Sequence, residues 1–230
     1  KRFVDLVRFL VEKNYDAAHF HLFESAAIGR LASWAAGIPI RIRMNETPAT
    51  LDGNTARRIE LAMRKFDTHT VASSELIRSQ YLQAGVKPAE VSVIYYGASI
   101  RTFSPGIITQ NAARQALFQR FGIPISGPLV GMVAHFYAQL HNSNFAAERY
   151  WGQPIKLHRL FISAAQEVLK TRPDAVFVLA GGAFRETDRL YFEEMKQEVN
   201  DCGLSEHVFF TGMISNIQEL LAALDLSVQC

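Results

Sequence analysis

The stretch KLHRLFISAAQEVLKTRPDAVFVLAGG, residues 156–182, decides the fold class. Its first part places an apolar residue at each position that one face of an α-helix would present. Pro173 follows that pattern, and the apolar run AVFVLA (175–180) then has the composition of a strand buried on both faces. The stretch therefore predicts a helix over 156–172 and a strand over 175–182 that runs into a glycine pair.

The same alternation of helix and strand continues along the whole chain. We predict helices at 3–11, 26–36, 54–66, 74–84, 111–121, 156–172, 189–202 and 216–223. We predict strands at 16–23, 38–45, 68–73, 91–96, 129–134, 175–182, 207–212 and 224–228. Alternating elements with apolar strands indicate an α/β protein whose parallel sheets are covered on both faces.

Two turn-rich segments, GASIRTFSPG (97–106) and GIPISGP (122–128), divide this pattern into two similar blocks. We therefore predict a partial first Rossmann-like domain over 1–104, a linker over 105–128 and a partial second Rossmann-like domain over 129–230. The chain does not begin with Met, and both of its ends fall inside predicted elements. We expect it to be part of a longer protein.

Composition narrows the class of partner. The chain has 230 residues, 49% of them hydrophobic, and a formal net charge of +2, which is typical of globular domains. No dense basic run indicates a nucleic-acid partner, and no apolar run reaches the about 20 residues of a membrane span. Two cysteines without a CxxC pattern favour a cytoplasmic protein. Contact of the basic first helix with anionic lipid and the oligomeric state remain open.

Residues that follow the strands of the second block indicate where a ligand binds. In open parallel sheets, ligands bind beyond the carboxyl ends of the strands. His135 follows the strand at 129–134, and Gly181 and Gly182 close the strand at 175–182. A glycine pair lets backbone amides approach an anion, and Lys156, at the start of a predicted helix, adds a full charge. This pattern favours a diphosphate or nucleotide site, although a tight turn and a solvated lysine would give the same pattern.

In the first block, the strand ends carry His21 and Asn45, which we expect to face the space between the two domains. A histidine at a strand end is also common as a structural residue. The P-loop pattern GxxxxGK[ST] and the patterns GxGxxG, HExxH and GxSxG do not occur in the sequence. Kinase, dehydrogenase, zinc-protease and serine-hydrolase functions therefore lose their main sequence support.

Three segments in the same order resemble the family 4 (group 1) glycosyltransferases. DAAHFHLFESAAIGRLASWAAGIPIRIRMN (16–45) is similar to the family's D-x-x-H-x-H segment. THTVASSELIRSQYLQAGVKPAEVSVIYYGASIRTFSP (68–105) is similar to the end of its first domain. LVGMVAHFYAQL (129–140), the helix–strand stretch quoted first and VFFTGMISNIQELLAALDLSV (208–228) are similar to the start of its second domain.

The resemblance implies a GT-B fold, in which two Rossmann-like domains face each other across a cleft. It also implies a retaining transfer of a sugar from a nucleotide-diphosphate sugar to an acceptor, without a metal ion or other cofactor. The acceptor could be a glycan, a lipid or a small molecule.

The resemblance also assigns roles to single positions. Lys156 matches a lysine that binds the donor diphosphate, and His135 stands where the family has an arginine with the same role. Catalytic positions implied in the first domain are His21, which matches a cleft-facing histidine, and Asn45, which stands where many members have a histidine. Donor-binding positions implied in the second domain are Gly181 and Gly182 near the phosphates, and Met213 and Ile214 near the base.

Some departures keep other functions open. Residues 138–155 lengthen a loop that is usually short, and Tyr96 replaces an asparagine. The family's E-x7-E segment would lie beyond residue 230, and its Gly-rich acceptor loop would lie before residue 1. One alternative is a GT-B nucleotide-sugar epimerase, for which Glu24 and Glu46 are the candidate acid–base groups. The other is a GT-B binding scaffold without catalytic activity.

Overall fold

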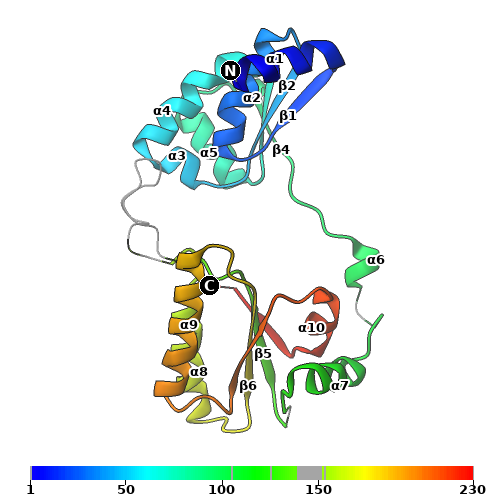
Figure 1. Ribbon diagram of the computed structural model, residues 1–230, viewed down its shortest axis with the longest axis vertical. Helices are drawn as coiled ribbons and strands as arrows, with labels where there is room; N and C mark the ends of the chain where they lie inside the picture. The colour runs from blue at the N-terminus through cyan, green and yellow to red at the C-terminus, as the bar shows by residue number, and fades with distance from the viewer. Residues whose placement is uncertain (1, 105, 125, 139–151, 153, 230) are drawn as a thin grey trace. The chain divides into compact units, whose positions relative to one another are not determined.

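The computed structural model describes residues 2–104, 106–124, 126–138, 152 and 154–229. It divides into two compact units, the first ending at Gly97 and the second beginning at Ala98. Each unit is a parallel sheet with helices packed against it (Figure 1). Within the described part of the chain, no helix has the length and hydropathy needed to cross a bilayer.

The first unit is built around four parallel strands in the order β1-β2-β3-β4. These strands are β1 (Ala17–Phe20), β2 (Ile40–Asn45), β3 (His69–Ala72) and β4 (Val91–Val93). The helices of this unit are α1 (Arg2–Lys13), α2 (Phe23–Ala35), α3 (Ala49–Asp52), α4 (Asn54–Met63) and α5 (Glu75–Gln83), with short 3-10 turns at Arg64–Phe66 and Pro88–Glu90.

Helix α1 differs from the other long helices because it contributes no buried residue. Its amphipathic pattern predicts a face packed against the protein, and in the structure Leu6 and Leu10 on that face are only half-buried. Phe3 and Phe9 are more than 40% exposed.

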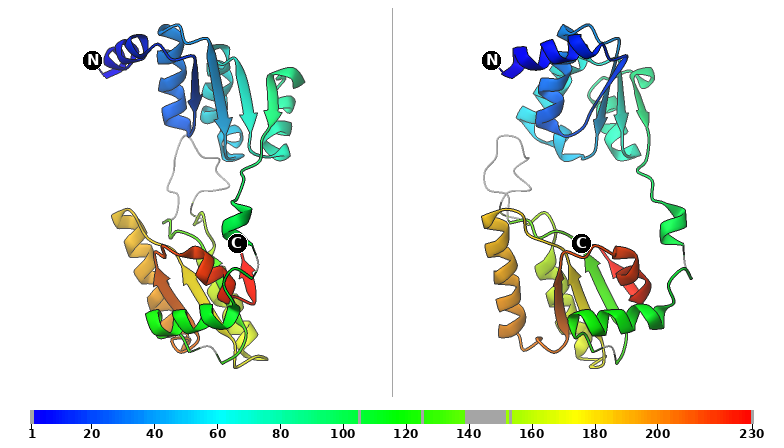
Figure 2. Two further views of the ribbon diagram at one scale, coloured as in Figure 1. Left: turned by 90° about the vertical axis from the view of Figure 1, so that its right-hand side faces the viewer. Right: turned by 45° about the vertical axis from the view of Figure 1, so that its right-hand side comes forward.

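The second unit contains four parallel strands in the order β7-β6-β5-β8. These strands are β5 (Leu129–Val133), β6 (Val176–Ala180), β7 (Val208–Gly212) and β8 (Leu226–Val228). The helices are α6 (Ile100–Phe103), α7 (Gln110–Phe121), α8 (His158–Leu169), α9 (Glu186–Asp201) and α10 (Ile217–Ala223). Figure 2 shows the sheet of this unit between two helical layers.

The sequence of strand β6 is apolar throughout because the strand contacts a core cluster on each face of the sheet. Phe177 and Leu179 belong to the core cluster on the side of α8 and α9, while Val176, Val178 and Ala180 belong to the cluster on the side of α7 and α10. Every residue of β6 is buried because both faces of the sheet are covered. The prediction of an α/β protein with parallel sheets is confirmed.

The structure divides the chain differently from the sequence analysis, which placed 105–128 in a linker. Helix α7 lies within that range and packs against α10. Ala113 and Leu117 of α7, together with Ile123, are fully buried in the second unit. These apolar side chains anchor the segment in the core, so it belongs to the second unit.

Candidate functional site

The site lies at the carboxyl ends of the strands in the second unit, where the sheet order changes direction. From β5 the chain adds β6 and then β7 on one side, and β8 pairs on the other side of β5. Such a switch point is where ligands bind in open α/β sheets. His135, two residues after β5, stands at this point.

A cavity of about 310 Å³ opens at these strand ends. It brings together four of the residues predicted from the sequence: His135, Gly181, Met213 and Ile214. The remaining lining residues are apolar, namely Val133, Ala134, Ala180 and Ile217. A mostly apolar cavity with few polar groups is typical of a small-molecule site.

A larger cavity of about 450 Å³ lies between residues 102–110 and α10. Its described lining residues include hydroxyl and amide groups but no charged side chain. Of these two cavities, the one at the strand ends is the better candidate for a ligand that carries phosphate, since a histidine lines it.

His135 is held in a defined orientation. Its ring packs against Phe184, with ring centroids 4.6 Å apart, and against Tyr137 at 6.0 Å. The Gly182 N–H donates to His135 Nδ1 at 3.4 Å. An Nδ1 that accepts a hydrogen bond carries no hydrogen, so the ring has its hydrogen on Nε2. His135 therefore presents an N–H donor, which suits a phosphate oxygen.

The glycine pair does not provide the amides that the sequence analysis expected. The Gly181 N–H donates to the Gly212 carbonyl at 3.0 Å, and the Gly182 N–H donates to His135 Nδ1. The reason is that β6 remains paired with β7 and β5 at and beyond its carboxyl end: Gly181 donates to Gly212 of β7, and the Phe136 N–H after β5 donates to the Gly182 carbonyl. The glycines are needed for close backbone approach rather than as anion donors.

Gly181→Ala tests this structural role. A Cβ atom at position 181 would lie 1.8 Å from the Ala134 carbonyl oxygen, so the ends of β5 and β6 would have to separate. We expect the free energy of unfolding to fall by about 3 kcal/mol, as for severe overpacking. Scanning calorimetry of the variant measures this loss. Gly97→Ala is the control, because among the described residues, apart from its chain neighbours, no atom lies within 4 Å of the position that its new methyl group would take. Equal losses in the two variants would contradict the argument.

Lys156 lies just before α8 rather than in it. The predicted helix began at Lys156, whereas α8 begins at His158 and Leu157 is its N-cap residue. The His158 ring stacks on Phe136 with centroids 3.9 Å apart, and its Nε2 lies 3.5 Å from the Ala134 carbonyl oxygen. Burial, together with the charge of Lys156, lowers the pKa of His158 below its usual value. The segment that carries Lys156 is thus fixed near the end of β5.

Two side chains near His135 have roles that the sequence analysis did not assign. Phe136, the residue after His135, is fully buried in the core on the side of α8 and α9. Asp188 of α9, itself buried, accepts from the Ala138 N–H at 2.9 Å and from the Arg185 N–H at 3.1 Å. Although burial opposes it, these hydrogen bonds lower the pKa of Asp188. Asp188 therefore fixes the backbone at Ala138, three residues after His135.

In the first unit, Asn45 is not where it was expected. It was predicted to face the space between domains, but its side chain is fully buried. Its Nδ2 donates to the Tyr81 hydroxyl at 3.2 Å, and its Oδ1 accepts from the Thr47 N–H at 3.3 Å. Asn45 is a structural residue because its amide is satisfied by α5 and by the turn after β2.

His21, by contrast, is half-exposed at the end of β1. Its Nδ1 lies 2.9 Å from Glu46 Oε1. Its ring also contacts that of His19, with centroids 4.3 Å apart. Burial lowers the pKa of His19, and the neighbouring His21 lowers it further.

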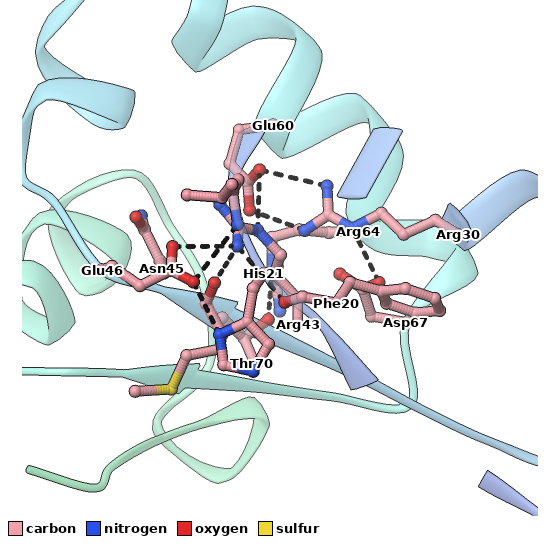
Figure 3. A network of polar contacts seen from close by, with 12 residues as sticks. Phe20, His21, Arg30, Arg43, Asn45, Glu46, Glu60, Arg64, Asp67 and Thr70 are labelled. Atoms are coloured by element: carbon pink, nitrogen blue, oxygen red, sulfur yellow. Dashed lines mark hydrogen bonds and ion pairs between the residues drawn. The ribbon is translucent and has the colours of Figure 1, made fainter. Parts of the chain in front are cut away.

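A buried ionic network lies beneath these strand ends (Figure 3). Arg30 donates to both carboxylate oxygens of Glu60, at 2.7 and 3.1 Å, and its Nε lies 2.9 Å from Asp67. Arg43 Nε lies 3.5 Å from Glu60, and the Tyr81 hydroxyl donates to Glu60 at 2.7 Å. This network fixes β2 to α2, α4 and α5.

The members of this network differ in pKa. Burial disfavours the charged form of Glu60, but the hydrogen bonds and charge of Arg30 outweigh it, so the pKa of Glu60 is lowered. Burial raises the pKa of Asp67 to about 7, because Arg30 compensates only part of its desolvation. Within the residues described, no group of three or more His, Cys, Asp or Glu side chains is placed to hold a metal ion.

Two parallel-sheet units, the second with a ligand-sized cavity at a switch point, define a two-domain Rossmann-like architecture. Sequence comparison matches residues 2–97 to the Glycosyl transferase 4-like domain and residues 153–230 to the Glycosyl transferases group 1 family. Both matches are to glycosyltransferase domains, as the sequence resemblance predicted.

Individual relatives agree with this assignment. The UDP-Gal:alpha-D-GlcNAc-diphosphoundecaprenol alpha-1,3-galactosyltransferase of Escherichia coli is 24% identical over 99% of the chain and 55% of its own length. The D-inositol 3-phosphate glycosyltransferase of Acidothermus cellulolyticus is 25% identical over 85% of the chain and 42% of its own length. The chain therefore spans about half the length of these curated relatives.

A solved structure supports the fold. The crystal structure of Anabaena HepE in complex with UDP-glucose superposes with a TM-score of 0.75 at 22% identity, over 99% of this chain and 56% of that chain. This similarity confirms the predicted GT-B fold.

Proposed function

We propose that the protein transfers a sugar from a nucleotide-diphosphate sugar to an acceptor, and that the cavity at the ends of β5, β6 and β7 holds the nucleotide part of the donor. The observation that carries this proposal is the convergence of His135, Gly181, Met213 and Ile214 on one cavity of about 310 Å³. Its volume and apolar lining suit a nucleoside with its phosphates near the polar end.

The proposal gives each group a chemical role. Met213 and Ile214 provide apolar walls for the base, and His135 donates Nε2–H to a phosphate oxygen. Lys156 stabilises the negative charge that develops on the leaving diphosphate, a preorganised electrostatic effect that requires no metal ion in this proposal. Retention of the anomeric configuration follows the family resemblance, and NMR of the product's anomeric proton tests it.

UDP is the first ligand to test, because the HepE structure contains UDP-glucose and the E. coli relative is named for UDP-Gal. We expect UDP to bind the chain and Met213→Glu to weaken that binding at least tenfold, since the new carboxylate would replace an apolar wall of the base with a charge. Leu190→Glu on α9 is the matched control, because Leu190 and Met213 are both more than 60% exposed. Isothermal titration measures both affinities.

The outcomes separate the alternatives. Weaker binding in Met213→Glu alone, with sugar transfer by the complete native polypeptide, supports the proposal. Binding without transfer or hydrolysis would instead favour the non-catalytic scaffold. If UDP and other nucleotides fail to bind, or if both variants weaken binding equally, the cavity is not the donor site.

A further inference from the structure

Glu46, the residue that follows β2, contacts both an exposed and a buried part of the first unit. Its Oε1 lies 2.9 Å from His21 Nδ1 and accepts from the Leu22 N–H at 3.2 Å, while its Oε2 lies 3.5 Å from Arg43 Nη1. The Glu46 side chain is only 18% exposed, whereas that of His21 is 49% exposed. One carboxylate thus joins a half-exposed histidine to the interior of the first unit (Figure 3).

The interior end of this chain of contacts is fixed. Arg43 is fully buried, and its guanidinium also contacts Glu60 and the Phe20 and Met44 carbonyl oxygens. Glu60 is held in turn by Arg30. Because Arg43 cannot move without breaking this buried network, it fixes the position of Glu46.

The backbone conformation of Leu22, next to His21, also indicates that Glu46 holds this segment in place. Leu22 has φ 61° and ψ 157°, a conformation that a residue with a Cβ rarely adopts. Conformations of this kind cost about 1–3 kcal/mol and persist where the surrounding structure imposes them. Here the hydrogen bond from the Leu22 N–H to Glu46 holds the backbone that orients His21.

The contact with Glu46 determines which nitrogen of His21 carries hydrogen. An ionised carboxylate only accepts hydrogen bonds, so Nδ1 must be the donor. In the neutral ring, Nε2 then has the lone pair and accepts a hydrogen bond. This is the opposite tautomer to that of His135, whose Nδ1 accepts from Gly182.

We propose that Glu46 is a positioning residue that holds neutral His21 as the Nδ1–H tautomer, so that Nε2 accepts a hydrogen bond from a hydroxyl group of the sugar or of its acceptor. The role of His21 toward a sugar hydroxyl rests on the proposed glycosyl transfer. The tautomer of His21 rests only on its contact with Glu46. Glu46 acts through His21, whereas an epimerase would need a carboxylate of its own to exchange a proton with the substrate.

The first test measures the tautomer without substrate. Long-range ¹H–¹⁵N NMR of the chain at alkaline pH, where imidazole is neutral, is expected to show His21 as the Nδ1–H form. Glu46→Ala is expected to shift His21 toward the Nε2–H form that predominates in solvated histidine. Glu24→Ala, which removes the same charge from a nearby exposed position, is expected to leave His21 unchanged. Glu46→Gln is expected to retain the Nδ1–H form, and it replaces Glu46→Ala if that variant fails to fold.

The second test uses the complete native polypeptide. Removing a residue that orients a metal-binding histidine typically costs about 10–100-fold in affinity or activity. We expect a loss of kcat of similar size in Glu46→Ala, with partial recovery in Glu46→Gln. A wild-type His21 in the Nε2–H form, or one insensitive to Glu46→Ala, overturns the inference. A changed tautomer with unchanged kcat overturns the functional role. If the wild type transfers no sugar at all, the proposed function fails, and the tautomer experiment still decides whether Glu46 orients His21.

Discussion

Glu60→Ala is expected to lower the free energy of unfolding of the first unit by about 3–5 kcal/mol, the cost of leaving buried charges without their partner. Glu60 is 1% exposed and contacts the guanidinium groups of Arg30 and Arg43, both equally buried. It also accepts from the Tyr81 hydroxyl. Without the carboxylate, two arginine charges and a tyrosine hydroxyl are left in the interior, and the remaining contacts with Asp67 and Glu46 do not compensate them fully.

Urea denaturation followed by tryptophan fluorescence can measure this loss in the first unit. The chain has two tryptophans, at positions 34 and 151. In a Trp151→Phe background the signal comes from Trp34, whose ring lies 5.2 Å from that of Phe66 in the first unit. The control is Glu75→Ala, which breaks an exposed pair with Arg78 at 3.7 Å and should cost less than about 1 kcal/mol. Equal losses in the two variants would show that the buried network does not stabilise this unit.

The elements of the fold could be predicted because their apolar residues follow a clear period. Strand β6 and helix α8 were both expected within a few residues of their observed bounds. Burial of β6 on both faces gives a continuous apolar run, and burial of α8 on one face gives a helical apolar period. The start of α8 was not predicted correctly, because Leu157 continues the apolar pattern although its backbone is not helical. Helix α3, four residues long, has too few residues to show any period.

The cavity of the second unit could be predicted for a topological reason. Residues that follow neighbouring parallel strands meet at one edge of the sheet, so His135, Gly181 and Met213 converge although they are far apart in sequence. Partners within each group could not be predicted in this way. Asn45 contacts Tyr81, 36 positions later, and Glu46 contacts His21, 25 positions earlier. The Asn45–Tyr81 pair depends on how α5 packs against the sheet. Glu46 and His21 do follow neighbouring strands, but their exact contact depends on the turns that the chain takes after β1 and β2.

Lys156→Ala is the second change for which we expect a large effect, a loss of about 10²–10³-fold in kcat for sugar transfer by the complete native polypeptide. Losses of this size follow the removal of one preorganised group that stabilises charge in the transition state. The structure supports this role because Lys156 is half-buried and lies two residues before His158, which is bound at the end of β5 beside His135.

Release of UDP from a UDP-sugar, measured with and without acceptor, gives kcat for the variant. UDP affinity from titration separates this effect from weaker donor binding. Lys170→Ala is the matched control: Lys170 carries the same charge at the end of α8, is well exposed and pairs with Glu167. Because the proposed role needs a positive charge at this position, Lys156→Arg should recover part of the lost activity. Near-normal turnover in Lys156→Ala would assign the stabilisation of the leaving diphosphate to other groups, and His135 would then be the first to replace.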